Sequence, residues 1–138
     1  MSGLDAFLNP AYTQETVEIV ISDRFLDENG KPVPFKLRSL SQNEMQRLQK
    51  KSYTDQMVNG KKSKVLDEFL YLDNCLVESV IYPNFKAHEL CERYGTEDPV
   101  TLPRLMLLKR EYEKLARAMM KLNGVDDDDI DLGEVTKN

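Results

Sequence analysis

The stretch TVEIVISDRFLDENGKPVPFKLR, residues 16–38, decides the class of fold that this sequence predicts. Val17, Ile19 and Ile21 alternate with other residues, and this period of two is typical of a β-strand. The run DENG that follows has turn chemistry, and the segment FKLR alternates again. The stretch therefore predicts an N-terminal β-hairpin.

The length of the loop follows from burial. A two-residue Asn-Gly loop would place Phe35 and Leu37 on the face opposite Ile19 and Ile21. Burial requires all four on one face, and a register slip of one residue reverses every side chain. We therefore expect a loop of three or five residues, with Gly30 in a left-handed bulge conformation.

After the hairpin the pattern becomes helical. Ser41 and Glu44 have the spacing of a capping box at the start of a short helix. The polar segment 50–64 contains Asn-Gly and predicts a loop. Ser63 then caps a long, central, buried helix, which Pro83 ends.

Two more helices complete the prediction. Asn84 caps a shorter helix that ends at Gly95, and the last helix starts near Pro103 and ends at Asn123-Gly124. The apolar residues of the last helix follow spacings of 3, 4, 3, 4 and 3. The predicted fold class is α+β, with the N-terminal hairpin packed against a bundle of about four helices.

The composition predicts one domain with a charged end. The chain has 138 residues, of which 41% are hydrophobic and 31% charged, as in ordinary globular proteins. The net charge is −5, and the last fifteen residues, with five aspartates, Glu134 and Lys137, account for all of it. We expect a single α+β domain over residues 1–124, with an arm at 1–12, and a disordered acidic tail at 125–138.

Catalytic and metal sites find little support in the sequence. The only histidine is His88, and no glycine-rich phosphate loop is present. Cys75 and Cys91 lie in helical patterns, and we expect both to be buried thiols. Together with His88 they lack the two tight ligand pairs of a structural zinc site. We therefore expect no enzyme activity, no metal and no cofactor.

An acidic run invites a calcium interpretation. Asp127, Asp129 and Asp131 have the alternate spacing of an EF-hand loop, but Leu132 occupies the position that needs glycine. No glutamate closes the loop before the chain ends. A solvated acidic tail is the better interpretation.

Two basic clusters invite a nucleic-acid interpretation. The segment 47–64 has six basic residues and one acidic, and the last helix carries a basic stripe. Nucleic-acid binders usually have a strongly basic domain, but residues outside the acidic tail sum to zero charge. Glu111 and Glu113 also interrupt the stripe, as predicted salt-bridge partners of Lys114 and Arg117. We therefore expect no nucleic-acid partner.

The sequence also lacks targeting features. No apolar run approaches the roughly 18 residues that a membrane helix needs. The first residues lack the basic start and apolar core of a secretory signal. We expect a cytoplasmic protein with no membrane partner.

Several segments together resemble the XkdN-like phage tail assembly chaperones. The resemblance spans nearly the whole chain in the right order. The stretch Leu102–Met106 departs from it, because a less basic stretch is expected there. The matching segments are DAFL at 5–8, SDRFLDENGKPV at 22–33, IYPNF at 81–85, Glu89-Leu90, Tyr94-Gly95, Glu111-Tyr112 and LNG at 122–124.

The resemblance implies a helper of tail building in contractile-tailed phages and prophages. It implies a non-catalytic protein that keeps the tape measure protein soluble, while tail tube subunits assemble around it in the bacterial cytoplasm. Two other hypotheses stay open. One is a small structural tail or neck component of the particle, and the other is a prophage regulator that binds nucleic acid through residues 47–64.

The surface that contacts the partner protein should consist of apolar residues that are not part of the predicted core. Apolar contact should then supply most of the affinity, with charge contributing steering. Two alternatives are that Phe85 caps the core and that the arm folds back on the domain. The candidates are Leu4, Phe7 and Leu8 on the arm, and the aromatic residues Tyr82 and Phe85 beside Pro83.

Overall fold

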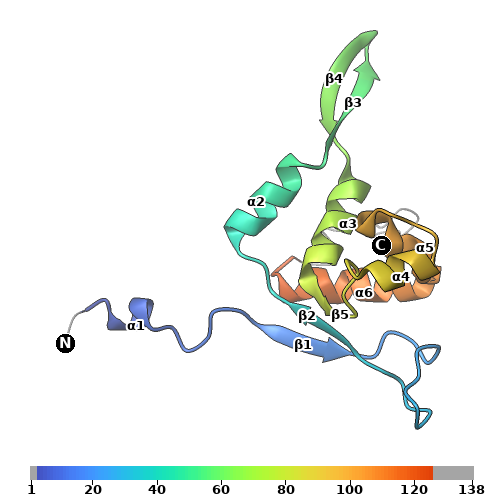
Figure 1. The fold of residues 1–138 in the computed structure, drawn as a ribbon. Helices are drawn as coiled ribbons and strands as arrows, with labels where there is room; N and C mark the ends of the chain where they lie inside the picture. Colours follow the sequence, from blue (N-terminus) through green and yellow to red (C-terminus); the bar gives the residue numbers. More distant parts are fainter. Residues whose placement is uncertain (1–2, 126–138) are drawn as a thin grey trace, which may run out of the picture.

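The computed structural model describes residues 3–125. Strands β1 (Thr16–Ile19), β2 (Phe35–Arg38) and β5 (Val80–Tyr82) form an antiparallel sheet in the order β1-β2-β5. The helices α3 and α6 pack against this sheet (Figure 1). The predicted α+β class, with an N-terminal hairpin against helices, is confirmed. The third strand was not predicted.

The register of β1 and β2 follows the burial argument. Val17 lies opposite Leu37, and Ile19 lies opposite Phe35, so directly opposed residues share a face. Phe35 and Leu37 are buried in the core, and Ile21, just beyond β1, is buried with them. The predicted common face is therefore confirmed.

The turn between the two strands is longer than a simple hairpin loop. Leu26 and Pro32 form an isolated antiparallel bridge, which encloses the five residues 27–31. Gly30 has φ 78°, a left-handed value that favours glycine. This turn has one of the two predicted loop lengths, but residues 20–34 separate β1 from β2, so the prediction that three or five residues join the two strands is wrong.

Helix α2 (Gln42–Lys50) begins at the predicted capping box. The Ser41 hydroxyl accepts a hydrogen bond from the Glu44 N–H at 3.1 Å, and the Glu44 carboxylate accepts one from the Ser41 N–H at 3.0 Å. Two backbone N–H groups at the helix start are thereby satisfied. Local side-chain chemistry is enough to place this helix end.

The loop predicted for residues 50–64 is wrong, because most of it forms a second hairpin. Strands β3 (Tyr53–Val58) and β4 (Lys61–Leu66) pair antiparallel, and Val58 lies opposite Lys61. Asn59 (φ 52°) and Gly60 (φ 80°) make the two-residue turn. The hairpin escaped prediction because it has no buried face, so its strands lack an apolar alternation.

Helix α3 (Glu68–Ser79) is the predicted central, buried helix, but both predicted ends are wrong. Ser63 lies in β4, and Asp67 caps the helix by accepting a hydrogen bond from the Leu70 N–H at 3.0 Å. At the other end the chain becomes extended at Val80 and joins the sheet as β5. Pairing with β2 therefore ends the helix before Pro83 does.

Helix α4 (His88–Arg93) is shorter than predicted. Asn84 does not cap it, because its side chain accepts a hydrogen bond from the Lys86 N–H at 3.0 Å in a local turn. The N-cap residue is Ala87. Gly95, at φ 76°, ends the helix region as expected.

The predicted last helix is divided. The 3-10 turn η1 (Pro99–Thr101) leads into α5 (Leu102–Met106), and α6 (Lys109–Leu122) begins after a break. Leu107 and Leu108 are extended, with ψ 144° and 159°, values that an α-helix does not permit. The regular spacing of apolar residues did not indicate this break, because two helices joined by a short extended segment can have the same spacing as one helix.

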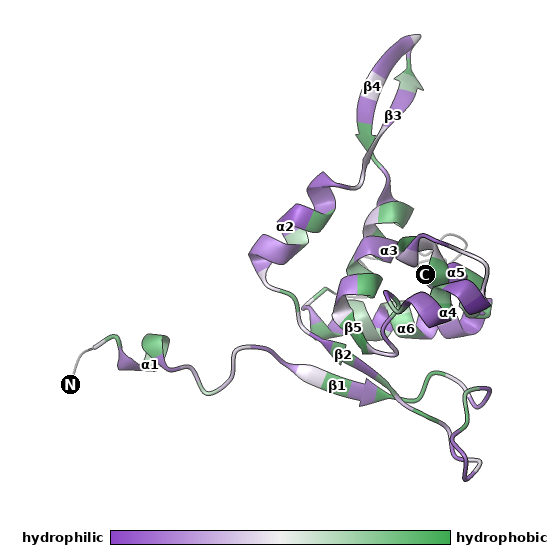
Figure 2. Cartoon of the chain, in the orientation of Figure 1, coloured by the Kyte–Doolittle hydropathy of each residue, from purple (hydrophilic) through white to green (hydrophobic). Residues whose placement is uncertain are grey.

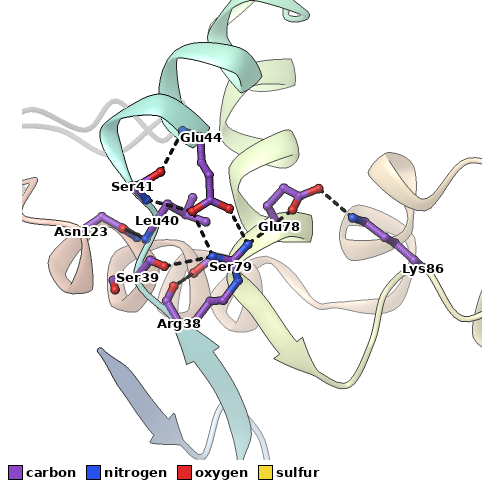
Figure 3. A network of polar contacts seen from close by, with 9 residues as sticks. All are labelled: Arg38, Ser39, Leu40, Ser41, Glu44, Glu78, Ser79, Lys86 and Asn123. Carbon is purple, nitrogen blue, oxygen red and sulfur yellow. Dashed lines mark hydrogen bonds and ion pairs between the residues drawn. The ribbon is translucent and has the colours of Figure 1, made fainter. Parts of the chain in front are cut away.

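A polar network joins the ends of four elements (Figure 3). Arg38, at the end of β2, donates to Glu44 of α2 at 2.8 Å and lies 3.6 Å from Glu78 of α3. The Ser79 hydroxyl donates to the Arg38 carbonyl at 2.6 Å. Asn123, after α6, accepts from the Leu40 N–H at 2.6 Å. The network fixes α2, α3 and α6 on the sheet.

The core lies between α3, α6 and the sheet. Phe35, Leu76, Leu115 and Met119 are among its fully buried residues. Cys75 and Cys91 are buried thiols, as predicted. Over the described range 3–125, no helix has the length and apolar character needed to cross a bilayer.

The C-terminal end of α6 has the predicted stop signal. Gly124 has φ 79°, and the Val125 N–H donates to the Met120 carbonyl at 2.9 Å, as in a Schellman motif. Val125 packs half-buried against the core. The acidic run 126–131 and the rest of the predicted tail lie outside the described residues, so the tail prediction stays a prediction.

Candidate protein-binding surface

The N-terminal arm presents apolar side chains to solvent. Helix α1 (Asp5–Leu8) is a single turn, closed by hydrogen bonds of 2.9 Å from the N–H groups of Phe7 and Leu8 to the Leu4 carbonyl. Phe7 is 82% exposed and Leu8 is 67% exposed. The turn places the side chains of Leu4, Phe7 and Leu8 on one side, as their spacing predicts.

The inner end of the arm is hydrogen-bonded to the domain. The Glu15 N–H donates to the Ser39 hydroxyl at 2.8 Å, and the Ser39 N–H donates to the Glu15 carbonyl at 2.7 Å. Beyond this contact the arm extends away from the sheet and helices (Figure 1). In Figure 2 the hydrophobic part of α1 stands apart from the hydrophobic segments of α3 and α5. The arm therefore does not fold back on the domain.

The two aromatic candidates differ in exposure. Tyr82 is 58% exposed on β5, next to Ile81, which is 40% exposed. Phe85 is fully buried, and its ring centroid lies 6.5 Å from that of Phe35. The expected exposure of Phe85 is wrong, because the chain turns inward after Pro83 and the ring fills the core.

The structure does not join the arm and Tyr82 into one surface. The arm precedes β1, and Tyr82 lies on β5 at the opposite edge of the sheet. Leu4, Phe7 and Leu8 therefore form one candidate patch, which we call the arm patch. Tyr82 and Ile81 form a second patch, which we call the β5 patch.

Glu111, one of the motif residues, has a structural role. The Arg24 guanidinium donates two hydrogen bonds to the Glu111 carboxylate, of 2.9 and 2.5 Å, and one to the Met106 carbonyl, of 3.2 Å. The Leu108 N–H donates to the same carboxylate at 2.8 Å. The Arg24 guanidinium holds the pKa of Glu111 down to about 2. The carboxylate thus ties the irregular segment after β1 to the break between α5 and α6.

Neither glutamate of α6 forms its predicted pair in the described network. Glu111 is buried and bound to Arg24, and Glu113 instead lies 3.1 Å from Lys109. The spacing along α6 offered both choices to Glu113. Only the packing of the segment around Arg24 selects the partner of Glu111.

Tyr112, the next motif residue, belongs to a second buried network. Its hydroxyl donates to the Asp73 carboxylate of α3, and Arg104 donates to the same carboxylate at 2.7 Å. Burial raises the pKa of Asp73, although the Arg104 guanidinium opposes this shift. Arg104, in the stretch that departs from the family resemblance, thus joins α5 to α3.

A surface pocket adjoins this network. The Arg104 guanidinium lies 5.5 Å from the ring centroid of Phe69 and 4.6 Å from that of Tyr112. Phe69 is half exposed, and Leu72 and Leu107 complete the apolar part of the lining. No local sequence pattern predicts this pocket, because its walls come from α3, α5 and α6 and from the break between the last two.

The histidine and the thiols are not assembled into one site. His88 is exposed on α4 and lies 3.1 Å from Glu92. The Cys91 thiol faces the Phe85 carbonyl at 3.2 Å in the core. Burial raises the pKa of the Cys75 thiol to about 12, so it stays protonated and unreactive at neutral pH. Within residues 3–125, no three histidine, cysteine or acidic side chains are placed to hold a metal ion.

Taken together, the described residues define a small α+β protein whose candidate surfaces are apolar patches suited to contact with other proteins. The family model described as "Phage XkdN-like tail assembly chaperone protein, TAC" matches residues 4–136. This chain belongs to that family of phage tail assembly chaperones.

Relatives in Bacillus subtilis (strain 168) agree with this assignment. The phage-like element PBSX protein XkdN is 34% identical over 137 residues, which cover 96% of this chain and 93% of XkdN. The uncharacterized protein YqbN is 39% identical, covering 96% of this chain and 92% of YqbN. A crystal structure of YqbN matches with a TM-score of 0.71 at 33% identity, over 88% of this chain and 96% of that one. The resemblance predicted from the sequence is therefore confirmed.

Proposed function

We propose that this protein binds the tape measure protein, and also tail tube subunits, as a non-catalytic chaperone during tail morphogenesis in the bacterial cytoplasm. The observation that carries the proposal is the arm patch. It exposes two large apolar side chains, at 82% and 67%, on an arm that extends from the domain. Exposed apolar groups on a soluble domain are favourable sites for contact with an apolar partner surface.

The chemistry of a tape measure protein suits such a patch. A long amphipathic chain exposes apolar stripes until the tail tube covers it, and exposed stripes promote aggregation. An amphipathic turn with apolar residues at i, i+3 and i+4 can pack against such a stripe. Burial of apolar area then supplies the affinity, and charge supplies steering.

The β5 patch provides a second contact of the same kind. Tyr82 combines a large apolar ring with a hydroxyl, which suits a surface that is buried only in a complex. Phe85 is excluded from this surface, because it is fully buried in the free protein. We therefore propose Leu4, Phe7, Leu8 and Tyr82 as contact residues.

A pull-down with the cognate tape measure protein tests the arm patch. The variant Phe7→Ala with Leu8→Asp removes the apolar surface of α1, whose hydrogen bonds are local, so the domain should stay folded. We expect at least about a tenfold loss of affinity at both low and high salt. The matched control is Leu26→Asp, which changes another exposed leucine outside both patches.

Three outcomes would contradict the proposal. Unchanged binding by the double variant would remove the arm patch from the mechanism. Binding that high salt alone abolishes would favour the basic segment 47–64. Recovery of the protein in purified phage particles would indicate a structural tail component, because an assembly chaperone should be absent from them.

A further inference from the structure

The β3–β4 hairpin is a second sheet with little support from the core. It forms a two-stranded ladder of six residue pairs and projects away from the helices (Figure 1). All residues of β3 except Thr54 are exposed. An isolated two-stranded hairpin is at best marginally stable in water. The hairpin would therefore gain stability from a further strand.

The root of the hairpin is nevertheless held firmly. The Asp67 N–H donates to the Ser52 carbonyl at 2.9 Å, which closes the base of the two strands. The Ser52 hydroxyl donates to the Leu48 carbonyl at 2.7 Å and accepts from the buried Asn74 at 2.9 Å. The direction in which the hairpin projects is therefore set by buried hydrogen bonds.

The two edges of the hairpin have different chemistry. Strand β4 carries Lys61, Lys62 and Lys64, and lysine on an edge strand opposes pairing with another chain. Strand β3 carries a single charge, at Asp55. Its Met57 is 70% exposed. The edge of β3 is thus the one open to a further strand.

The lysines of β4 are also partly neutralised. Asp55 lies 3.7 Å from Lys62 and 3.4 Å from Lys64 across the hairpin. A nucleic-acid ligand would have to compete with this carboxylate for both ammonium groups. The charge distribution therefore favours a protein strand along β3 over a nucleic acid along β4.

We propose that β3 pairs antiparallel with β3 of a second copy of this chain. Directly opposed residues in an antiparallel pair place their side chains on the same face of the sheet. In a pair related by a two-fold axis, one residue of β3 must therefore lie opposite the same residue of the second copy, with the axis between them. An axis at Asp55 would oppose two carboxylates, which repel each other. An axis at Gln56 instead opposes Asp55 to Met57 and Thr54 to Val58 of the second copy.

The register centred on Gln56 uses residues 54–58 of both strands and opposes no like charges. An axis at Met57 would leave only three residues of each strand paired, because β3 ends at Val58. The dimer would be a four-stranded sheet with the lysine-bearing β4 strands outermost. Six residues extend about 20 Å, so the antiparallel arrangement keeps the two domains at opposite ends of the sheet.

The mass of the full-length protein, measured by analytical ultracentrifugation over a concentration series, tests this register. We expect a dimer that dissociates on dilution. The variant Gln56→Lys opposes two ammonium groups at the axis, and should weaken dimerisation about tenfold or more. The matched control Ser63→Lys adds the same charge on the opposed residue of β4, away from the proposed seam, and should leave the dimer intact.

A cysteine variant locates the seam directly. Directly opposed Cα atoms lie about 4.5–5.5 Å apart, which permits a disulfide. Under oxidation Gln56→Cys should give a covalent dimer, whereas Ser63→Cys should not, because residue 63 lies away from the proposed seam. The native Cys75 and Cys91 are buried, so they should not form disulfides between two copies.

Each of the remaining outcomes would overturn the proposal. A wild-type protein that stays monomeric at all concentrations would contradict the proposed dimer. Equal effects of the two lysine variants, or of the two cysteine variants, would contradict the proposed seam. Salt-sensitive DNA binding by a monomer, lost in Lys62→Glu, would assign the hairpin to nucleic acid. All of these measurements omit the tape measure protein, so they stand or fall independently of the proposed function.

Discussion

The two hairpins of this protein are built on the same local rules but have different environments. In the first, β1 and β2 oppose apolar residues, and Phe35 and Leu37 of β2 are buried under the helices. In the second, β3 and β4 form a longer and more regular ladder, joined by an Asn-Gly turn, with no fully buried residue. Regular pairing and burial are therefore separate properties.

This difference shows where stability resides. The first hairpin gains its free energy from apolar burial against α3 and α6, which tolerates an irregular connection of fifteen residues between Ile19 and Phe35. The second depends on turn geometry and on cross-strand pairs, each of which contributes only about 0.2–1 kcal/mol. A change in the first should affect global unfolding, whereas a change in the second should act locally.

The largest difference should come from truncating one side chain in each hairpin. Leu37→Ala removes a fully buried side chain from β2 and should lower the free energy of unfolding by about 2–5 kcal/mol. Met57→Ala removes an exposed side chain from β3 and should change it by less than about 0.5 kcal/mol. Urea unfolding of both variants, followed by circular dichroism, measures the difference. Equal losses would show that the second hairpin belongs to the global folding unit.

Acid should destabilise the domain through carboxylates that arginines hold. The pKa of Glu44, beside Arg38, and that of Glu111, beside Arg24, are each lowered from 4.5 to about 2. Because these folded-state values lie below the unfolded ones, the stabilisation is complete above about pH 4.5 and is lost as the pH falls toward 2. The loss for each group is at most on the order of 3 kcal/mol.

Unfolding measured between pH 6 and pH 2.5 checks this expectation. Glu111→Gln should be less stable at neutral pH and should show a shallower decline in acid, because one of the two groups no longer titrates. An unchanged slope would mean that Arg24 does not hold the carboxylate in the way described.

The smallest effects should come from the turn glycines. Gly30 and Gly60 have φ values of 78° and 80°, and no atom lies within 4 Å of a Cβ built on either residue. Alanine should therefore cost about 1 kcal/mol of backbone strain at each position, with no steric clash. Gly60→Ala should raise amide hydrogen exchange across β3 and β4 and leave the melting temperature nearly unchanged. A lowered melting temperature would show that the second hairpin supports the domain.

Much of the fold could be predicted because adjacent residues carry the signal. The capping box at Ser41, the stop at Gly124 and the turn at Gly30 each depend on residues within one turn of chain. The face shared by Ile19 and Phe35 followed from a burial argument that needs no knowledge of the partner helices. The apolar arm was also visible from the sequence, since it needs only a spacing of three and four.

The errors occurred where distant segments compete with local preference. The apolar pattern through Val80 favoured helix, but hydrogen bonding of this segment to β2 made it a strand. The continuous spacing through Leu108 favoured one helix, but the buried Glu111 accepts hydrogen bonds from both Leu108 and Arg24 at the break. The exposed β3–β4 hairpin was missed for a different reason, because an apolar alternation develops only on a face that is buried.

The sequence alone therefore determined the fold class, the common face of the first hairpin, the capping box at Ser41, the apolar arm and the family resemblance. The family resemblance combines several short segments along the chain, and each of the other features depends on chemistry within a few residues or on the requirement that apolar side chains share a face. Only the tertiary structure decided that Phe85 is core, that Glu111 and Tyr112 bind Arg24 and Asp73, and that a second hairpin projects from the domain. Such pairs lie 39 to 87 residues apart in the chain, and only the packing of the whole domain selects one partner among many.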